Sequence, residues 1–302
     1  MLDLAAYPLR ARPVPPLPVE RLVLGRPVEE AAELLPRLFN LCRVAQGTAA
    51  RAAFGLPLAE GWQEALRAEI LREHVVKLCL KWPGLMSRPA VALPPVWQTD
   101  MGALSEAVFG EGRAVPRDIE SFEDWLAQGQ GAAPVLGAIG ALFAPGEGAR
   151  PVLPLTDESS VFSSVPQENS VPARHARHPL LAGIEARWGR GPLWSATGVL
   201  LDLAALLDGR MPPATLASGR AVVPAARGLY GVRATVERGV VTRFERVTPT
   251  DHLLAPEGGL AHSLASLPPE RARALAPLLV AVLDPCYPVS LRGAQDEDRT
   301  DA

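Results

Sequence analysis

The sequence predicts a helix-rich α+β fold with a small β-hairpin or sheet, and three observations support this prediction. The chain has 302 residues, of which 48% are hydrophobic, so it is long enough to bury a large core. Several long segments place their apolar residues at the spacing of an amphipathic helix. Residues 230–236 and 240–246, joined through Arg238 and Gly239, have instead the composition of a β-hairpin.

The N-terminal part of the chain predicts an extended lead-in followed by two helices. Residues 1–18 are rich in proline, which disfavours helical backbone. A helix begins at Pro27, where Glu29 and Glu30 in the first turn favour the helix dipole. We expect it to place Cys42 on its apolar face, because apolar residues recur at Leu38, Leu41, Cys42, Ala45 and Ala49. A second amphipathic helix spans residues 61–81 and stops at Pro83.

The rest of the chain predicts four more helices and one long loop region. A sequence resembling a capping box begins a helix at Ser121 that ends near Gly129. Residues 133–143, 193–207 and 268–282 are the other predicted helices, and the last of them ends shortly before Cys286. Residues 145–179 are rich in proline and serine, which predicts a loop or a poorly ordered linker.

Composition and charge exclude several classes of function. The net charge of −3 gives no electrostatic reason to expect binding to nucleic acid or to an anionic membrane. No segment has the pattern of a secretory signal or the length and apolarity of a membrane span. Three widely spaced cysteines argue against a disulfide framework and indicate the reducing cytoplasm. We therefore expect one domain over residues 19–292, loop-rich at 145–187, with a disordered acidic tail at 293–302.

The last predicted structured segment contains a recognisable motif. Asp284, Pro285 and Cys286 match the C-terminal motif of the nickel-iron hydrogenase large subunits, in which Asp-Pro-Cys is followed by a second cysteine and then by His or Arg. Val289 occupies the position of that second cysteine, and Arg292 follows it. The segment thus resembles the family motif with one thiolate missing.

A second half-motif lies near the other end of the chain. Residues 37–46 fit the frame of the family's N-terminal signature, with Arg37 and Cys42 matching and with Phe39, Asn40 and Gln46 replacing its first cysteine, its glycine and its histidine. Further similar segments follow in the family's order, at 67–75, 191–193, 225–228 and 240–256. The resemblance covers residues 17–80 and 188–292.

This pattern resembles the HupK-type hydrogenase expression/formation proteins, which are shortened homologues of the large subunit. The resemblance implies a truncated large-subunit fold and a non-catalytic role in the maturation of a nickel-iron uptake hydrogenase. Partners would be the apo large subunit and other maturation proteins. Cys42 falls on a bridging position and Cys286 on a terminal nickel position, while Arg227 matches an arginine that lies over the metals. Glu20 matches a glutamate that supports a second metal.

The missing cysteines change the expected metal chemistry. Neither Phe39 nor Val289 can donate a lone pair, so no complete nickel-iron centre is expected. Cys42 and Cys286 would instead hold an iron cyanide/carbonyl fragment transiently, as a scaffold that gives its cargo away. Two alternatives remain open at this point. One is a catalytic subunit with a reduced ligand set, and the other is a metal-free interaction protein that mimics the large subunit.

The candidate residues also have ordinary structural interpretations. Cys42 alone would be a small buried hydrophobe, as Cys79 is expected to be. Arg227 could be a solvated turn residue, and Glu20 a surface carboxylate. His175 and His178 form an HxxH pair, which we interpret as part of a solvated loop. His74 is expected to be a hydrogen-bonded histidine between helices.

Overall fold

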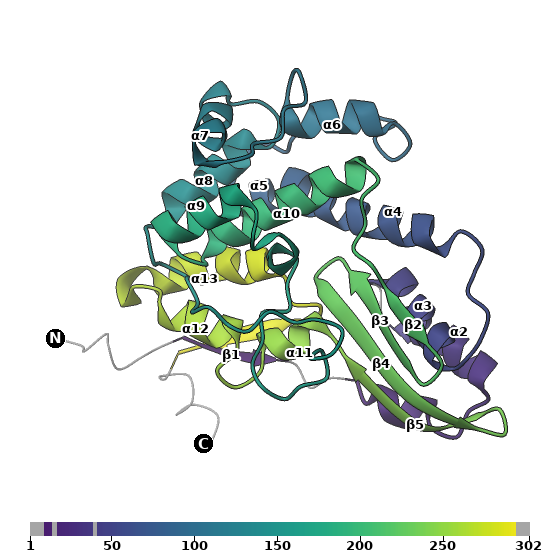
Figure 1. Ribbon diagram of the computed structural model, residues 1–302. Helices are drawn as coiled ribbons and strands as arrows, with labels where there is room; N and C mark the ends of the chain where they lie inside the picture. Colours follow the sequence, from purple (N-terminus) through teal and green to yellow (C-terminus); the bar gives the residue numbers. More distant parts are fainter. Residues whose placement is uncertain (1–8, 14–16, 39–40, 294–302) are drawn as a thin grey trace.

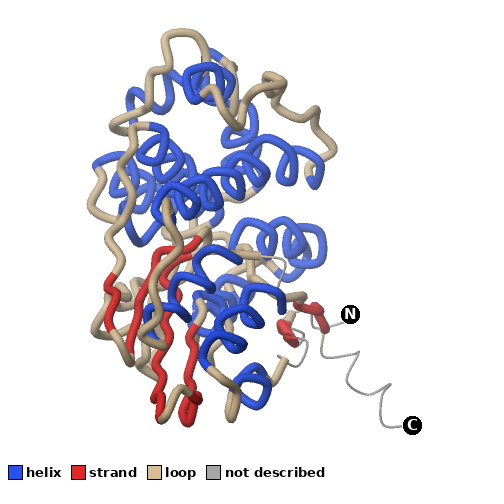
Figure 2. The backbone as a smooth tube through the Cα atoms, turned by 90° about the vertical axis from the view of Figure 1, so that its right-hand side faces the viewer, coloured by secondary structure: helices blue, strands red, loops and turns tan. Residues whose placement is uncertain are grey.

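The computed structural model describes residues 9–13, 17–38 and 41–293 of the chain. The acidic tail predicted at 293–302, apart from Gly293, lies outside the described residues, as do Phe39, Asn40 and much of the predicted lead-in. The fold is α+β and helix-rich, which confirms the predicted class. Most helices pack together in one part of the molecule, and a β-sheet flanked by the first helices forms the other (Figures 1 and 2).

The helices occupy most of the chain between residues 19 and 283. Their bounds are α1 Val19–Val23, α2 Val28–Leu38, α3 Arg43–Ala53, α4 Trp62–Val75, η2 Val76–Lys81, α5 Trp82–Leu85, α6 Met101–Phe109, α7 Ile119–Gln128, α8 Ala133–Leu142, η3 Pro172–His175, α9 Pro179–Trp188, α10 Pro192–Leu207, α11 Pro249–Leu253, α12 Gly259–Ala265 and α13 Pro269–Leu283. Of these, η2 is a π-helix and η3 is a 3₁₀-helix. The sequence did not predict α1, α5, α6, α9, α11, α12 or η3.

A four-stranded antiparallel sheet, ordered β2-β3-β4-β5, contains the predicted hairpin. The hairpin consists of β4 (Gly228–Glu237) and β5 (Val240–Val247), and it is extended by β3 (Arg220–Ala225) and β2 (Thr215–Ala217). Helix α3 packs against β3 and β4. The two added strands were not predicted, because β2 is short and Pro224 weakens the strand pattern of β3.

A separate pair of strands joins the two ends of the described chain. Strand β1 (Arg10–Pro13) pairs in antiparallel fashion with β6 (Val289–Arg292). Extended backbone near the N-terminus follows from its prolines, but the pairing partner could not be predicted from local sequence. As a consequence, the segment just after Cys286 is held by the N-terminal strand.

Two predicted helices differ from the structure in ways that shape the site. The helix beginning at Pro27 does not continue through Cys42, because Cys42 adopts left-handed backbone (φ 53°) between α2 and α3. Glu69 accepts hydrogen bonds from the N–H groups of Val44 and Ala45 at 2.8 and 3.1 Å, which stabilises a new helix start there. The helix over 61–81 also does not stop at Pro83, because this proline lies in the first turn of α5.

The loop-rich segment at 145–187 packs onto the helices instead of forming a detached linker. Arg150 and Glu168 form a buried ion pair within it, with Nε and Oε2 2.6 Å apart. It contains η3 and nearly all of α9.

The helix predicted from Ser121 begins earlier in the structure. The capping box of α7 is formed by Asp118 and Ser121, so α7 begins at Ile119.

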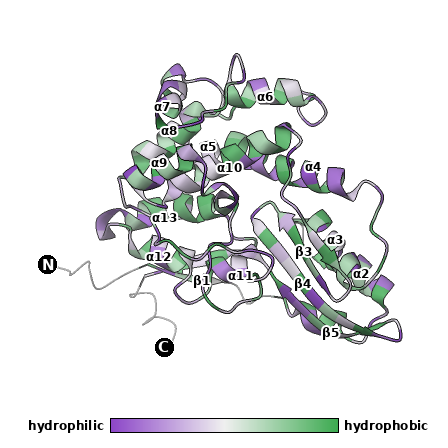
Figure 3. Ribbon diagram, in the orientation of Figure 1, coloured by the Kyte–Doolittle hydropathy of each residue, from purple (hydrophilic) through white to green (hydrophobic). Residues whose placement is uncertain are grey.

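Helix α10 forms the centre of the hydrophobic core. Its residues from Pro192 to Leu206 are all buried, and it packs against α4, α8, α9 and α13. Figure 3 shows the apolar character of α10. Among the helices that the structure describes, none combines the length and apolarity needed to cross a bilayer.

We predict that Gly228→Ala destabilises the protein by about 2 kcal/mol, because an added methyl group would overlap a neighbouring residue. A Cβ atom at Gly228 would lie 2.4 Å from Oδ1 of Asn169, whose side chain hydrogen-bonds to the N–H and C=O of Leu229. Urea unfolding would measure this change. Gly239→Ala is the matched control, since its Cβ meets open space and only the positive φ of 76° is unfavourable. Equal destabilisation by both variants would contradict the steric explanation.

Candidate functional site

The two cysteines singled out in the sequence line one pocket. The pocket lies where the start of α3, the β3–β4 turn and the segment after α13 meet. Its lining residues are Leu41, Cys42, Gln46, Ala225, Arg227, Tyr230, Arg246, Thr248, Pro249 and Cys286. The structure therefore brings together Cys42, Cys286 and Arg227, three residues that are far apart in sequence.

Cys42 is positioned by the break between α2 and α3. Its left-handed backbone precedes the first turn of α3, which Glu69 caps from helix α4. The Nη1 atom of Arg227 lies 3.5 Å from the Cys42 sulfur. Burial raises the pKa of the Cys42 thiol, and the nearby Arg227 charge opposes this effect without cancelling it. The thiol is therefore protonated at neutral pH.

Cys286 is positioned by the end of α13. Asp284 adopts left-handed backbone (φ 54°) at the C-cap of this helix and turns the chain toward the pocket. The N–H of Cys286 donates a hydrogen bond to Oγ1 of Thr250 at 2.8 Å. Cys286 is half-buried, as Cys42 is.

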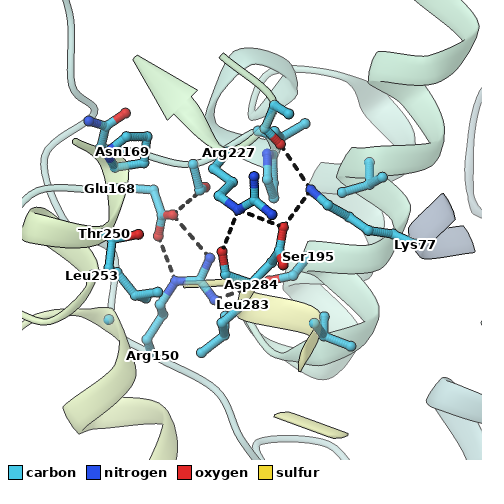
Figure 4. Close-up of a pocket in the computed structure, with 18 of the residues that line it drawn as sticks. Lys77, Arg150, Glu168, Asn169, Ser195, Arg227, Thr250, Leu253, Leu283 and Asp284 are labelled. Atoms are coloured by element: carbon cyan, nitrogen blue, oxygen red, sulfur yellow. Dashed lines mark hydrogen bonds and ion pairs between the residues drawn. The ribbon is translucent and has the colours of Figure 1, made fainter. Parts of the chain in front are cut away.

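The buried carboxylate of Asp284 holds the cations of the site together. Its oxygens lie 2.8 Å from Nζ of Lys77, 3.0 Å from Nε of Arg227 and 3.2 Å from Nζ of Lys81. Figure 4 shows Lys77 and Arg227 approaching this carboxylate from different segments. Although burial opposes ionisation, the charges of Lys77, Arg227 and Lys81 hold the pKa of Asp284 well below its ordinary value.

Arg227 is a buried residue of the site and not a solvated turn residue. Its side chain is 7% exposed, and its Nε also donates to the backbone oxygen of Asp284 at 3.1 Å. Its Nη2 lies 3.5 Å from a carboxylate oxygen of Glu73. Burial alone would lower the pKa of Arg227, but the negative charges of Asp284 and Glu73 raise it. The guanidinium is therefore permanently charged beside the thiol pocket.

Lys77, Lys81 and Glu73 are site residues that the sequence analysis missed. Lys77 and Lys81 belong to the π-helix η2, a form of helix that occurs frequently at functional sites. Lys77 is 4% exposed and donates a hydrogen bond to the backbone oxygen of Ala226 at 2.9 Å. A signal was present, because the only two lysines in the sequence lie four residues apart in an otherwise apolar stretch.

Other candidate residues lie outside this pocket. Glu20 is exposed on α1 and lines a separate surface groove with Arg220 and Arg233. Cys79 is buried in the core, and burial raises the pKa of its thiol to about 12. Within residues 9–13, 17–38 and 41–293, no group of three or more His, Cys, Asp or Glu side chains is arranged to hold a metal ion.

A second polar cluster surrounds Asp202, close to the β3–β4 turn. One oxygen of its carboxylate lies 2.8 Å from Nε2 of His74 and 2.8 Å from Nη1 of Arg174, and the other lies 2.8 Å from Nε2 of His175. Burial lowers the pKa of His74 to about 4, so its neutral ring donates Nε2–H to Asp202. The predicted role of His74 as a hydrogen-bonded residue between helices is confirmed.

The HxxH residues do not point to a shared metal site. His175 is bonded to Asp202, whereas Nδ1 of His178 accepts a hydrogen bond from the N–H of Leu180 at the start of α9. The two imidazoles thus have different structural partners. The interpretation of His175 as part of a solvated loop is wrong, because its ring contacts the buried Asp202.

We predict that His74 makes folding stability fall with decreasing pH between about 6.5 and 4. In the unfolded chain the imidazole gains its proton near pH 6.5, while the folded protein resists protonation until about pH 4. This difference favours unfolding at the lower pH by up to about 3 kcal/mol. Urea midpoints measured across that pH range test the prediction. His74→Gln keeps a donor to Asp202 but cannot titrate, so an equally steep profile in that variant would contradict the assignment.

The comparisons with known proteins agree with one family. No protein-family model matches the chain. The hydrogenase expression/formation protein HupK of Rhodobacter capsulatus is 48% identical over 280 residues, covering 93% of this chain and 91% of that protein. The hydrogenase expression/formation protein HupV of Azotobacter chroococcum is 27% identical, with 89% of each chain covered.

Among solved structures, the nickel-iron-selenium hydrogenase of Desulfovibrio vulgaris Hildenborough in its reduced state has the same fold. Its TM-score is 0.55 at 13% identity, covering 92% of this chain and 95% of that chain. The as-isolated oxidised form gives a TM-score of 0.54 at 12% identity, with the same coverage. This structural likeness shows the fold alone. The expected resemblance to the fold of a hydrogenase large subunit is therefore confirmed.

Proposed function

Because the chain belongs to the HupK family of hydrogenase expression/formation proteins, we propose that it carries an iron cyanide/carbonyl fragment during nickel-iron hydrogenase maturation. Cys42 and Cys286 would be the two thiolate ligands of this cargo, and Arg227 would donate hydrogen bonds to its cyanides. The cargo would pass to the apo large subunit, with other maturation proteins taking part, in the cytoplasm. The protein itself would be non-catalytic.

The observation that carries this proposal is the shared pocket of Cys42 and Cys286. Thiolates are soft ligands suited to low-spin iron. The described residues offer the pocket no third cysteine, since Cys79 is buried in the core. Two thiolates in place of the four of a complete bimetallic centre favour a cargo that is held weakly enough to be released.

The charges around the pocket favour an anionic metal complex over a free metal cation. In the ion cluster around Asp284, Lys77, Lys81 and Arg227 contribute three positive charges and Asp284 and Glu73 two negative charges, which leaves this cluster with one surplus positive charge. Arg227 extends from this cluster into the thiol pocket, which Arg246 also lines. Cyanide ligands are anionic and accept hydrogen bonds, so they match the donors of Arg227. A bare dication would be repelled by the same cations.

Protons provide a means of loading and release. The buried Cys42 thiol has a raised pKa, so formation of its bond to iron must displace a proton. Release would reverse this step, because the sulfur regains a proton as the iron–sulfur bond breaks. Iron therefore dissociates more readily from a cysteine with a raised pKa than from one that stays a thiolate without the metal.

We predict cyanide and carbonyl infrared bands in protein purified anaerobically from a host that expresses the iron-ligand assembly machinery. Cys42→Ser and Cys286→Ser should each abolish these bands, because either change leaves a single thiolate ligand. Cys79→Ser is the matched control and should retain them, since Cys79 lies in the core. Bands that persist in the Cys42→Ser/Cys286→Ser double variant would refute the ligand assignment.

The same preparations separate the proposal from its rivals. A wild-type protein that lacks the bands but binds the apo large subunit in a one-to-one ratio would be a metal-free chaperone. Hydrogen uptake by the isolated protein after nickel loading would instead indicate a catalytic subunit with a reduced ligand set. Neither result is compatible with a carrier of the iron fragment.

We also predict that loading strengthens as pH rises toward the pKa of Cys42. In this range the proton that leaves Cys42 on binding should by itself improve the apparent affinity by up to about tenfold per pH unit. Band intensity measured over a pH series at limiting cargo would follow the change. Loading that is independent of pH would show that Cys42 does not exchange a proton for iron.

A further inference from the structure

The position of Arg227 is fixed through the backbone of the turn that carries it. Ala226 and Arg227 form a two-residue turn, because Ala225 of β3 pairs directly with Gly228 of β4. The backbone oxygen of Ala226 accepts a hydrogen bond from Lys77. The side chain of Asn169 bonds to both polar groups of Leu229, the residue that follows Gly228. The turn therefore depends on side chains from elsewhere in the chain.

Arg174 bonds to the turn on both sides of Arg227. Its Nη2 donates to the backbone oxygen of Ala225 at 2.5 Å and to that of Gly228 at 2.8 Å. These two oxygens belong to the residues that flank the turn. Nη1 of the same guanidinium bonds to Asp202, so its rigid fork links the turn to that carboxylate, which the single nitrogen of a lysine cannot do in the same geometry.

Asp202 in turn fixes the orientation of Arg174. Its carboxylate is 1% exposed and lies 2.8 Å from Nη1 of Arg174. Two further donors, His74 and His175, hold the same carboxylate. The position of Asp202 is thus set from three sides on the central core helix α10, where its backbone has little freedom to move.

We propose that the Asp202–Arg174 ion pair positions Arg227 against the thiol pocket, although neither residue lines that pocket. Arg174 of this pair bonds to both ends of the turn. The Arg227 guanidinium is therefore held in one position between Asp284 and the Cys42 sulfur. The functional role of this arrangement rests on the proposed function, in which Arg227 would donate hydrogen bonds to the cyanides of the cargo and orient them. The positioning itself can be tested without cargo.

The first test is solution NMR of protein labelled with ¹⁵N in arginine only. The Nε–H of Arg227, assigned by its loss in Arg227→Lys, is buried against Asp284 and should exchange slowly with solvent. In Asp202→Asn its exchange should become faster by about tenfold or more, because the turn is no longer clamped. Arg174→Lys should have the same effect and serves as the second variant if Asp202→Asn does not fold.

A matched control separates positioning from general loss of stability. Glu147→Gln weakens another ion pair, to Arg271, that lies away from the turn and has contacts of 2.7 and 2.8 Å. It should leave the exchange of the Arg227 Nε–H unchanged. If exchange stays at the wild-type rate in folded Asp202→Asn and Arg174→Lys, or accelerates equally in Glu147→Gln, the positioning role is wrong.

The second test uses the infrared bands of loaded protein. If Asp202→Asn shifts the cyanide bands in the same direction as Arg227→Lys, the clamp acts on the cargo through Arg227. Cyanide bands identical to those of wild type would overturn that part of the proposal. If wild-type protein shows no bands, the carrier function has failed, and the exchange of the Arg227 Nε–H still decides whether the pair positions Arg227.

Discussion

The buried carboxylate of Asp284 is the constraint on which the rest of the site depends. Without it, Lys77 and Arg227 would be two buried positive charges, and Arg227 would keep a carboxylate contact through Glu73. A buried ion pair contributes little net stability against apolar packing, but removing one partner is strongly unfavourable. Asp284 therefore serves chiefly to specify a structure, because it draws the end of α13, the β3–β4 turn and η2 to one point.

The π-helix η2 explains how one helix supplies two of the cations around this carboxylate. Lys77 is almost fully buried and Lys81 is 45% exposed, yet both lie within 3.2 Å of an Asp284 oxygen. A π-turn has a less favourable geometry than an α-turn and is usually retained where it serves a site. Here it directs the buried Lys77 to both Asp284 and the backbone of Ala226, so the ion cluster also fixes the turn that carries Arg227.

Local signals in the sequence allowed part of this structure to be predicted. The end of α13 just before Cys286 and the β4–β5 hairpin follow from apolar spacing and from Arg238-Gly239. The break at Cys42 could not be predicted, because the cap of α3 is provided by Glu69 from another helix. The motif frames identified the two thiols and Arg227, but Lys77 and Lys81, which contact Asp284, come from a helix whose sequence pattern indicated only a structural role.

The loss of two cysteines and the retention of the charged surroundings have one physical consequence. A permanent metal centre needs enough thiolates to saturate the metal, and this pocket offers two sulfur atoms. The raised pKa of Cys42 limits the negative charge of the empty pocket, and the surplus positive charge of the neighbouring cluster offsets part of the charge of a bound cyanide complex. Arg227 then sets the position of that complex, and the weakness of a two-sulfur attachment lets a fuller set of thiolates on a partner remove it.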